Sequence, residues 1–348
     1  MPALTGSLAV IGGGVIGLSV ARRAAQAGWS VWVHRTGEPG GASWVAGGML
    51  APHSEAWPGE EQQLQLGLRA LELWHSTAPG CFLDGLPPQV VTARESLVVA
   101  VDRADVADLH TVADWLSAQG HPVQWVGPDQ RVGELEPLLA PGIRHGFRAL
   151  TELAVDNRAV LSALETACNR LGVSWAGPVP DAAALAELAA DAVVVANGID
   201  APTLWPGLPI RPVKGEVLRL RWRRGCLPVP LRVIRARVRG RQVYLVPRAD
   251  GVVVGATQYE HGRDTAPVVS GVRDLLDDAC TLAPGLGEYE LAECSAGLRP
   301  VTPDNLPLVQ RLDSRTLVAA GHGRNGFLLA PLAAEQVVSE LLPVGVCQ

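Results

Sequence analysis

Three glycines near the start of the chain have the spacing of a nucleotide-binding turn. Gly12, Gly14 and Gly17 form a G-x-G-x-x-G pattern between an apolar run at 8–11 and a helix predicted over 15–27. The first glycine permits a tight turn, the second lets the backbone approach a pyrophosphate, and the third lets helix and strand pack closely. The start of the helix offers free N–H groups to phosphates. The alternative is an ordinary βαβ unit whose glycines serve packing alone.

The next predicted strand, at 30–34, ends in His34 and is followed by Arg35. Units of this kind usually place an acidic residue there for the adenosine ribose, and that residue is missing. His34 can hydrogen-bond a hydroxyl and Arg35 can meet a phosphate, so both are compatible with a nucleotide. A solvated strand end fits the two side chains equally well.

Composition limits the class of protein. At 348 residues the chain is longer than one core usually fills, so we expect two closely packed domains. Hydrophobic residues make up 48% and charged residues 18%, which suits a well-buried enzyme. The net charge of −6 argues against a nucleic-acid or anionic-membrane partner. With no signal peptide and no apolar run of ~18 residues, we expect a cytoplasmic protein without a membrane span.

Cysteine and histidine positions indicate no metal site. The cysteines lack C-x-x-C pairs and zinc-ligand spacing, and we expect mostly buried thiols in a reducing compartment. They are Cys81, Cys168, Cys226, Cys280, Cys294 and Cys347. No histidine is assigned a catalytic role, and solvated or structural roles are favoured for His53 and His322.

Apolar periodicity predicts the elements that position these residues. Helices are expected at 60–75, 105–119, 157–171, 272–282 and 327–342, and strands at 96–101, 173–176, 306–309 and 316–320. The apolar run 192–195 is typical of a strand buried on both faces of a parallel sheet.

The pattern changes after residue 213. Alternation at 218–223 and a hairpin formed by 243–246 and 252–255 predict antiparallel strands. For the arginines between 219 and 241, a solvated sheet face is favoured over a partner-docking site. No linker is apparent, so we expect two α/β domains that interleave.

Five stretches together resemble the D-amino-acid-oxidase-like flavoproteins, and among them the glycine oxidase branch. They are G-G-G-V-I-G at 12–17, A-S-W-V-A-G-G-M-L-A-P at 42–52, Y-L-V-P-R at 244–248, G-L-R-P at 297–300 and G-H-G-R-N-G-F-L-L-A-P at 321–331. The stretches at 42–52 and 324–331 are specific to that branch. Both argue against a nicotinamide enzyme, which shares only the first turn.

The resemblance implies a noncovalently bound FAD. It implies a Rossmann-type FAD-binding domain from 1–84, 151–212 and 293–348, interleaved with a mainly antiparallel-sheet substrate-binding domain from 85–150 and 213–292. The implied cofactor residues are Gly12, Gly14, Val15, Ile16, Gly17, His34, Arg35, Ala42, Ser43, Gly47, Gly48, Met49, Ala196, Asn197, Gly198, Arg324, Asn325, Gly326 and Phe327.

The resemblance also implies a carboxylate-binding pair, Arg299 and Tyr244, with Arg324 as a further substrate-binding residue. A guanidinium fork grips a carboxylate at two points, and a tyrosine adds one oriented donor. Without the resemblance, a surface salt bridge for Arg299 and a core aromatic role for Tyr244 would be favoured. Related sarcosine oxidases attach flavin through a cysteine; Cys294 is near that position, but Gly297 aligns with it.

The implied activity is oxidative deamination. A hydride passes from the glycine Cα to flavin N5, giving an imine and then glyoxylate and ammonia, while O2 becomes H2O2. No catalytic side chain is required, because the flavin carries the chemistry. The imine would supply thiazole synthesis in thiamine biosynthesis, with thiazole synthase as a partner and a homo-oligomer compatible with the sequence.

Other activities stay open. A D-amino-acid, sarcosine or proline oxidase or dehydrogenase would use the same chemistry, and Gly323, where an aromatic residue is expected, would widen the pocket for a larger amine. From other classes, a nicotinamide-dependent dehydrogenase and a non-catalytic flavin-binding protein remain as alternatives.

Overall fold

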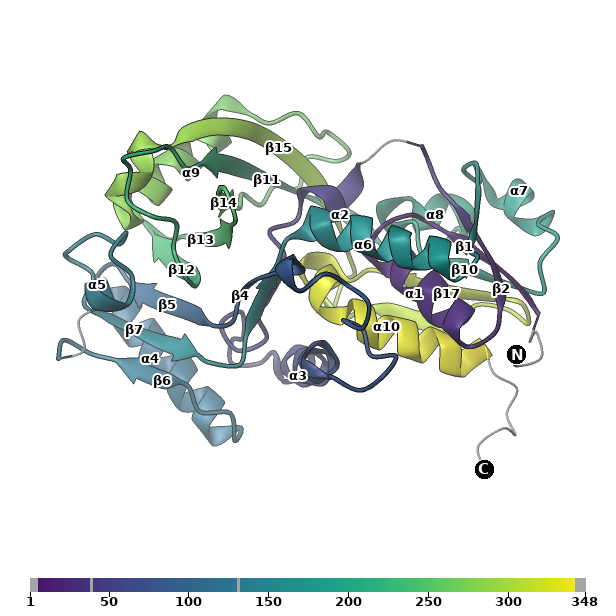
Figure 1. The fold of residues 1–348 in the computed structure, drawn as a ribbon, viewed down its shortest axis with the longest axis horizontal. Helices are drawn as coiled ribbons and strands as arrows, with labels where there is room; N and C mark the ends of the chain where they lie inside the picture. The colour runs from purple at the N-terminus through teal and green to yellow at the C-terminus, as the bar shows by residue number, and fades with distance from the viewer. Residues whose placement is uncertain (1–5, 38–39, 130–131, 342–348) are drawn as a thin grey trace.

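The computed structural model describes residues 6–37, 40–129 and 132–341, and it has two sheets side by side with helices packed on them (Figure 1). The helices are α1 (Val15–Gln26), α2 (Gly41–Val45), α3 (Glu61–His75), α4 (Arg103–Ala118), α5 (Val132–Leu135), α6 (Asn157–Arg170), α7 (Ala182–Ala186), α8 (Ala201–Leu204), α9 (Val269–Leu282) and α10 (Gly326–Leu341).

The first sheet has five parallel strands and one antiparallel edge strand. Its order is β16 (Leu308–Arg311), β17 (Thr316–Ala320), β10 (Ala192–Val195), β1 (Ser7–Ile11), β2 (Ser30–His34) and β9 (Ser174–Ala176), with β16 antiparallel to β17. Helices α1, α6 and α10 bury one face, and α7 and α8 bury the other. The apolar run predicted to be buried on both faces is β10, and that prediction is confirmed.

The second sheet is mainly antiparallel. Its order is β15 (Glu290–Val301), β11 (Arg211–Arg221), β14 (Gly251–Gly255), β13 (Arg241–Arg248), β12 (Val233–Val238), β5 (Ser96–Ala100), β7 (His145–Ala149) and β6 (Gln124–Val126), with only β12 and β5 parallel among these pairs. A small third sheet joins β3 (Met49–Leu50), β8 (Leu153–Val155) and β4 (Val91–Ala93). The chain crosses repeatedly between the two large sheets, as the interleaved pattern predicts.

Local signals set the ends of helix α6. The Asp156 carboxylate accepts hydrogen bonds from the N–H groups of Arg158 and Ala159 at 2.9 and 3.0 Å, which satisfies two free donors of the first turn. Gly172, just beyond the helix, has φ +77°, a conformation that favours glycine. The helix lies within one residue of the expected range 157–171.

Alternation along the second sheet separates a core face from a face that bears functional side chains. Leu218, Leu220, Leu245 and Val254 point to α9 and are buried with it. The residues between them point the other way. On that opposite face Arg235 lies across from Tyr244, and Tyr244 lies across from Gly255.

Several expectations need correction. The stretch 42–52, for which no helix or strand is predicted above, contains most of α2 and all of β3. Among the described cysteines only Cys168 is buried and the other four are partly exposed, so the expectation of mostly buried thiols is wrong; Cys347 lies outside the described residues. Strands β11 and β15 run across the expected domain boundaries at 212/213 and 292/293, and the domain division stays a prediction.

Within 6–37, 40–129 and 132–341, no helix is long and apolar enough to cross a bilayer, and no acidic, histidine and cysteine side chains group into a metal site.

Candidate active site

A cavity of about 1160 Å³ extends from the glycine turn after β1 to strands β11, β13 and β15 of the second sheet. Every residue named above for cofactor or substrate lines it except Gly17. The structure therefore brings together segments from both ends and the middle of the chain. Their individual roles stay predictions.

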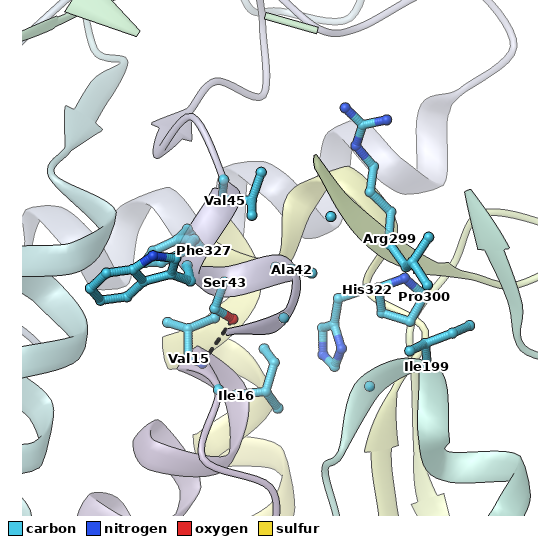
Figure 2. Close-up of a pocket in the computed structure, with 18 of the residues that line it drawn as sticks. Val15, Ile16, Ala42, Ser43, Val45, Ile199, Arg299, Pro300, His322 and Phe327 are labelled. Atoms are coloured by element: carbon cyan, nitrogen blue, oxygen red, sulfur yellow. Dashed lines mark hydrogen bonds between the residues drawn. The ribbon is translucent and has the colours of Figure 1, made fainter. Parts of the chain in front are cut away.

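The glycine turn leaves no room for side chains. A Cβ on Gly12 would lie 2.4 Å from the carbonyl oxygen of Ala196, and one on Gly17 would lie 2.0 Å from the carbonyl oxygen of Gly12. Gly17 is therefore a packing glycine inside α1, which explains why it does not reach the cavity. Val15 N–H, at the start of α1, donates to Ser43 Oγ at 3.1 Å, which ties the turn to α2 (Figure 2).

A carboxylate does lie near the end of β2, but it is supplied by helix α6. Glu165, on α6, lines the cavity and pairs with the guanidinium of Arg35, which also stacks over the ring of Trp175 at 4.3 Å. His34 Nδ1 lies 3.1 Å from the carbonyl oxygen of Gly177. Arg35 therefore has an anionic partner within the protein. Glu165 was not predicted, because it lies 130 residues from Arg35 and no local motif marks it.

Arg299 has no carboxylate partner among the described residues. Its Nη1 donates to the carbonyl oxygen of Thr257 at 3.3 Å, and the rest of the fork is left for a ligand. By contrast, Arg235 and Arg324, which also line the cavity, both pair with Glu55. A cationic fork that lines a cavity and forms no ion pair with the described residues is suited to bind a carboxylate.

Gly215 makes the space that the Arg299 side chain occupies. A Cβ on Gly215 would lie 2.4 to 2.7 Å from Nη2, Cζ and Nη1 of that guanidinium. The guanidinium is planar and rigid, so it would have to move as a unit.

We expect Gly215→Ala to raise KM for a carboxylate substrate about tenfold or more with a smaller effect on kcat, because a misplaced fork loses ground-state binding. Steady-state kinetics would measure the separate effects on KM and kcat. Gly142→Ala is the matched control, because nothing lies within 4 Å of a Cβ at that position. Unchanged KM in Gly215→Ala would contradict the role.

The Tyr244 ring also occupies space that is free only because two neighbouring residues are glycines. A Cβ on Gly255 would lie 2.3 Å from the phenol Cζ and oxygen, and one on Gly47 would lie 3.0 Å from the phenol oxygen. Burial raises the pKa of Tyr244, so its hydroxyl stays protonated at neutral pH and can donate a hydrogen bond.

Arg324 forms ion pairs within the protein that the sequence did not predict. Its Nε lies 2.9 Å from Glu55 Oε2 and its Nη2 lies 3.4 Å from Glu60 Oε2, while 46% of the side chain is exposed. It lies at the edge of the cavity with two carboxylates beside it. Its proposed contacts with substrate and flavin stay predictions.

The arginines between 219 and 241 do not form one solvated face. Arg235 is 11% exposed and its Nη1 lies 2.6 Å from Glu55 Oε1 inside the cavity. Arg219 Nη2 donates to Asn157 Oδ1 at 3.0 Å, and Arg232 pairs with Glu136 at 3.1 Å. The expectation is wrong for these three, because buried carboxylates and amides from other segments lie against the sheet.

His53 and His322 are buried rather than solvated. They are 8% and 5% exposed, and burial lowers the pKa of each to about 4, so both are neutral at pH 7. His322 Nε2 has no partner among the described residues, and His322 lines the cavity (Figure 2). A buried polar atom without a partner is costly, so this nitrogen is available to a ligand.

Comparison with known proteins identifies the family of this chain and its cofactor. Residues 7–340 match the family described as FAD dependent oxidoreductase, DAO. This chain is a member of that family. Membership of the family shows that the cofactor is FAD and confirms both the resemblance and the α/β fold class inferred from the sequence.

Relatives of this FAD-dependent oxidoreductase extend over the whole chain. The putative thiamine biosynthesis oxidoreductase ThiO of Rhizobium etli is 36% identical over 341 residues, with 96% of this chain and 95% of the relative covered. The bifunctional protein ThiO/ThiG of Synechocystis is 32% identical, with 97% of this chain but 52% of the relative covered. The solved structure of glycine oxidase from Geobacillus kaustophilus superimposes with a TM-score of 0.84 at 28% identity, covering 97% of this chain and 94% of that one.

Proposed function

We propose that this FAD-dependent oxidoreductase is an amino-acid oxidase that oxidises glycine to its imine, which then yields glyoxylate and ammonia. One observation carries the proposal: Arg299, with no carboxylate partner among the described residues, lies with Tyr244 in the cavity that begins at the glycine turn. Support also comes from the ThiO and glycine oxidase relatives.

The cavity fits FAD at its nucleotide end. The absence of side chains at Gly12 and Gly14 and the start of α1 suit a pyrophosphate. His322 Nε2 and Asn197 Oδ1, both buried without a protein partner in the described chain, suit hydroxyl and amide groups of the cofactor. Gly47, Gly48 and Met49 line the same cavity, with Gly47 against the Tyr244 ring, and these residues would hold the flavin ring.

The protein binds and orients the substrate. Arg299 holds the glycine carboxylate through its fork, and the Tyr244 hydroxyl donates a second hydrogen bond to the same group. These contacts fix the orientation of the substrate Cα in the site. Tyr244 packs against a buried apolar cluster that includes Val45, Val217 and Val246, and this cluster excludes water from the side of the site next to Tyr244. Bound FAD supplies the hydride acceptor and the route for electrons to O2.

We infer that the imine serves thiazole synthesis, with thiazole synthase as the partner and a cytoplasmic location. The ThiO/ThiG relative supports this inference, because a region similar to this chain is there joined to a second one of comparable length. Co-purification of the two proteins, with labelled glycine traced into the thiazole, tests it.

The visible spectrum tests the oxidase proposal. We expect flavin absorption in the purified protein and its bleaching when glycine is added without O2. If the absorption bands of oxidised flavin persist with glycine but bleach with sarcosine or a D-amino acid, the substrate is that other amine and not glycine. Persistence with every amine would contradict an amino-acid oxidase.

The flavin is expected to be released by acid precipitation, leaving a colourless pellet. No cysteine is found among the described residues that line the cavity, and Cys294 packs toward the opposite face of the sheet with the α9 core. A yellow pellet after acid precipitation and washing would contradict noncovalent binding.

A further inference from the structure

A second cavity of about 320 Å³ lies next to the main one. The two cavities share five lining residues, namely Glu55, Glu60, Arg235, Gln242 and Arg324. Beyond them, the lining includes apolar side chains such as Val98, Leu109, Val112 and Phe147, together with the polar Ser54, Asp105, Asp108 and Arg237. The shared residues therefore separate the substrate end of the site from an additional, partly apolar space.

Ion pairs link three of the shared residues, Glu55, Arg235 and Arg324, which we call the partition. Glu55 Oε1 lies 2.6 Å from Arg235 Nη1, and Glu55 Oε2 lies 2.9 Å from Arg324 Nε. Arg324 Nη2 also donates to the carbonyl oxygen of Glu55 at 3.2 Å. One carboxylate thus joins a strand of the second sheet to the turn before α10.

The turn that carries Glu55 is itself anchored. Glu152 is fully buried, and its Oε1 accepts from the N–H groups of His53 and Ser54, each at 2.7 Å, while its Oε2 accepts from Ser54 Oγ at 2.7 Å. Burial alone would raise the pKa of Glu55, but Arg235 and Arg324 hold it below its ordinary value, so the carboxylate stays charged. The partition is therefore formed at neutral pH.

The partition begins one strand away from the substrate-binding pair. Arg235 on β12 lies directly across from Tyr244 on β13, on the face that also carries Arg299. A larger substituent that extended along this face from a carboxylate held at Arg299 and Tyr244 would meet the Glu55–Arg235 ion pair, whose two residues line both cavities.

We propose that the partition is a size-selecting wall that restricts this site to glycine-sized amines by closing it from the second cavity. The proposal rests on the amino-acid oxidase function. The class of substrate it excludes is a larger amino acid or N-alkylglycine with an apolar substituent, because Val98, Leu109, Val112 and Phe147 offer apolar contacts behind the wall.

Equilibrium binding of carboxylates to the holoenzyme tests the wall without turnover. Acetate and hexanoate are titrated into the FAD-bound protein and followed by the flavin spectrum. We expect the wild type to prefer acetate, and Glu55→Ala and Arg235→Ala to shift the ratio of the dissociation constants about tenfold or more toward hexanoate. Arg235→Ala leaves Glu55 paired with Arg324, so it remains informative if Glu55→Ala fails to fold.

The matched control removes an ion pair elsewhere. Glu335→Ala breaks the surface pair with Arg23, 2.7 Å long, and should keep the wild-type ratio. The proposal is overturned if the wild type binds hexanoate as tightly as acetate, or if the folded partition variants keep the wild-type ratio or lose both ligands equally.

Turnover rates distinguish the proposed oxidase function from the proposed size-selecting wall. With glycine and N-butylglycine, both partition variants should gain at least about tenfold in relative kcat/KM for N-butylglycine. If the wild type fails to oxidise glycine, the proposed function fails, while the carboxylate ratios still decide whether the wall exists.

Discussion

Replacing Arg299 with alanine is expected to lower kcat/KM for glycine by about 10²- to 10³-fold, the range for losing one partner of a desolvated charge pair. No second cation replaces the fork, because the nearby Arg235 and Arg324 are already paired with Glu55. Arg299→Lys should be intermediate, since a single ammonium cannot make the bidentate contact. Stopped-flow reduction of the flavin by glycine and titration with acetate measure the effect.

A surface arginine provides the control for that substitution. Arg223 is exposed just beyond β11, and Arg223→Ala should leave glycine oxidation unchanged. FAD content and the circular dichroism spectrum of Arg299→Ala should match the wild type. Normal glycine reduction and acetate affinity in Arg299→Ala would remove Arg299 from the site.

Gly17→Ala is expected to yield a chain that is purified largely without FAD. Its Cβ would lie 2.0 Å from the carbonyl oxygen of Gly12, so α1 must move away from the turn that we propose receives the pyrophosphate. The ratio of flavin to protein absorbance and the dissociation constant for added FAD would measure the loss, which we expect to be about 10²-fold or more, corresponding to nearly 3 kcal/mol.

The control distinguishes cofactor loss from unfolding. Gly142→Ala introduces the same methyl group where nothing lies within 4 Å, and it should bind FAD normally. Circular dichroism of Gly17→Ala should show a folded protein, because the affected contact is confined to one turn. Full FAD occupancy in Gly17→Ala would refute the close-packing role of this glycine.

Sequence motifs located part of the cavity lining, including the predicted cofactor and substrate residues other than Gly17. Arg299 and Tyr244 lie 55 positions apart, and only the resemblance linked them; strand register then places both on one face of the second sheet. Sequence reasoning missed Gly215, a residue without a side chain whose role is to leave space. It also favoured a solvated or structural role for His322, although its position in the 321–331 motif was a usable signal.

The sequence by itself determined most of the elements, because their signals are local, and its motifs indicated FAD through their resemblance to a family. The turn from Gly12 to Gly17 and the alternation at Leu218 and Leu220 are each read within a few residues. Such patterns report which backbone conformation a segment favours and which face it buries.

Only the tertiary structure decided which charged groups meet. Glu55 pairs with Arg235 across 180 positions, and Arg35 pairs with Glu165 across 130. No periodicity encodes these pairs, because they depend on the register of strands and on how the two sheets pack. The glycine turn therefore follows from the sequence, whereas the wall that bounds the substrate site follows from the fold.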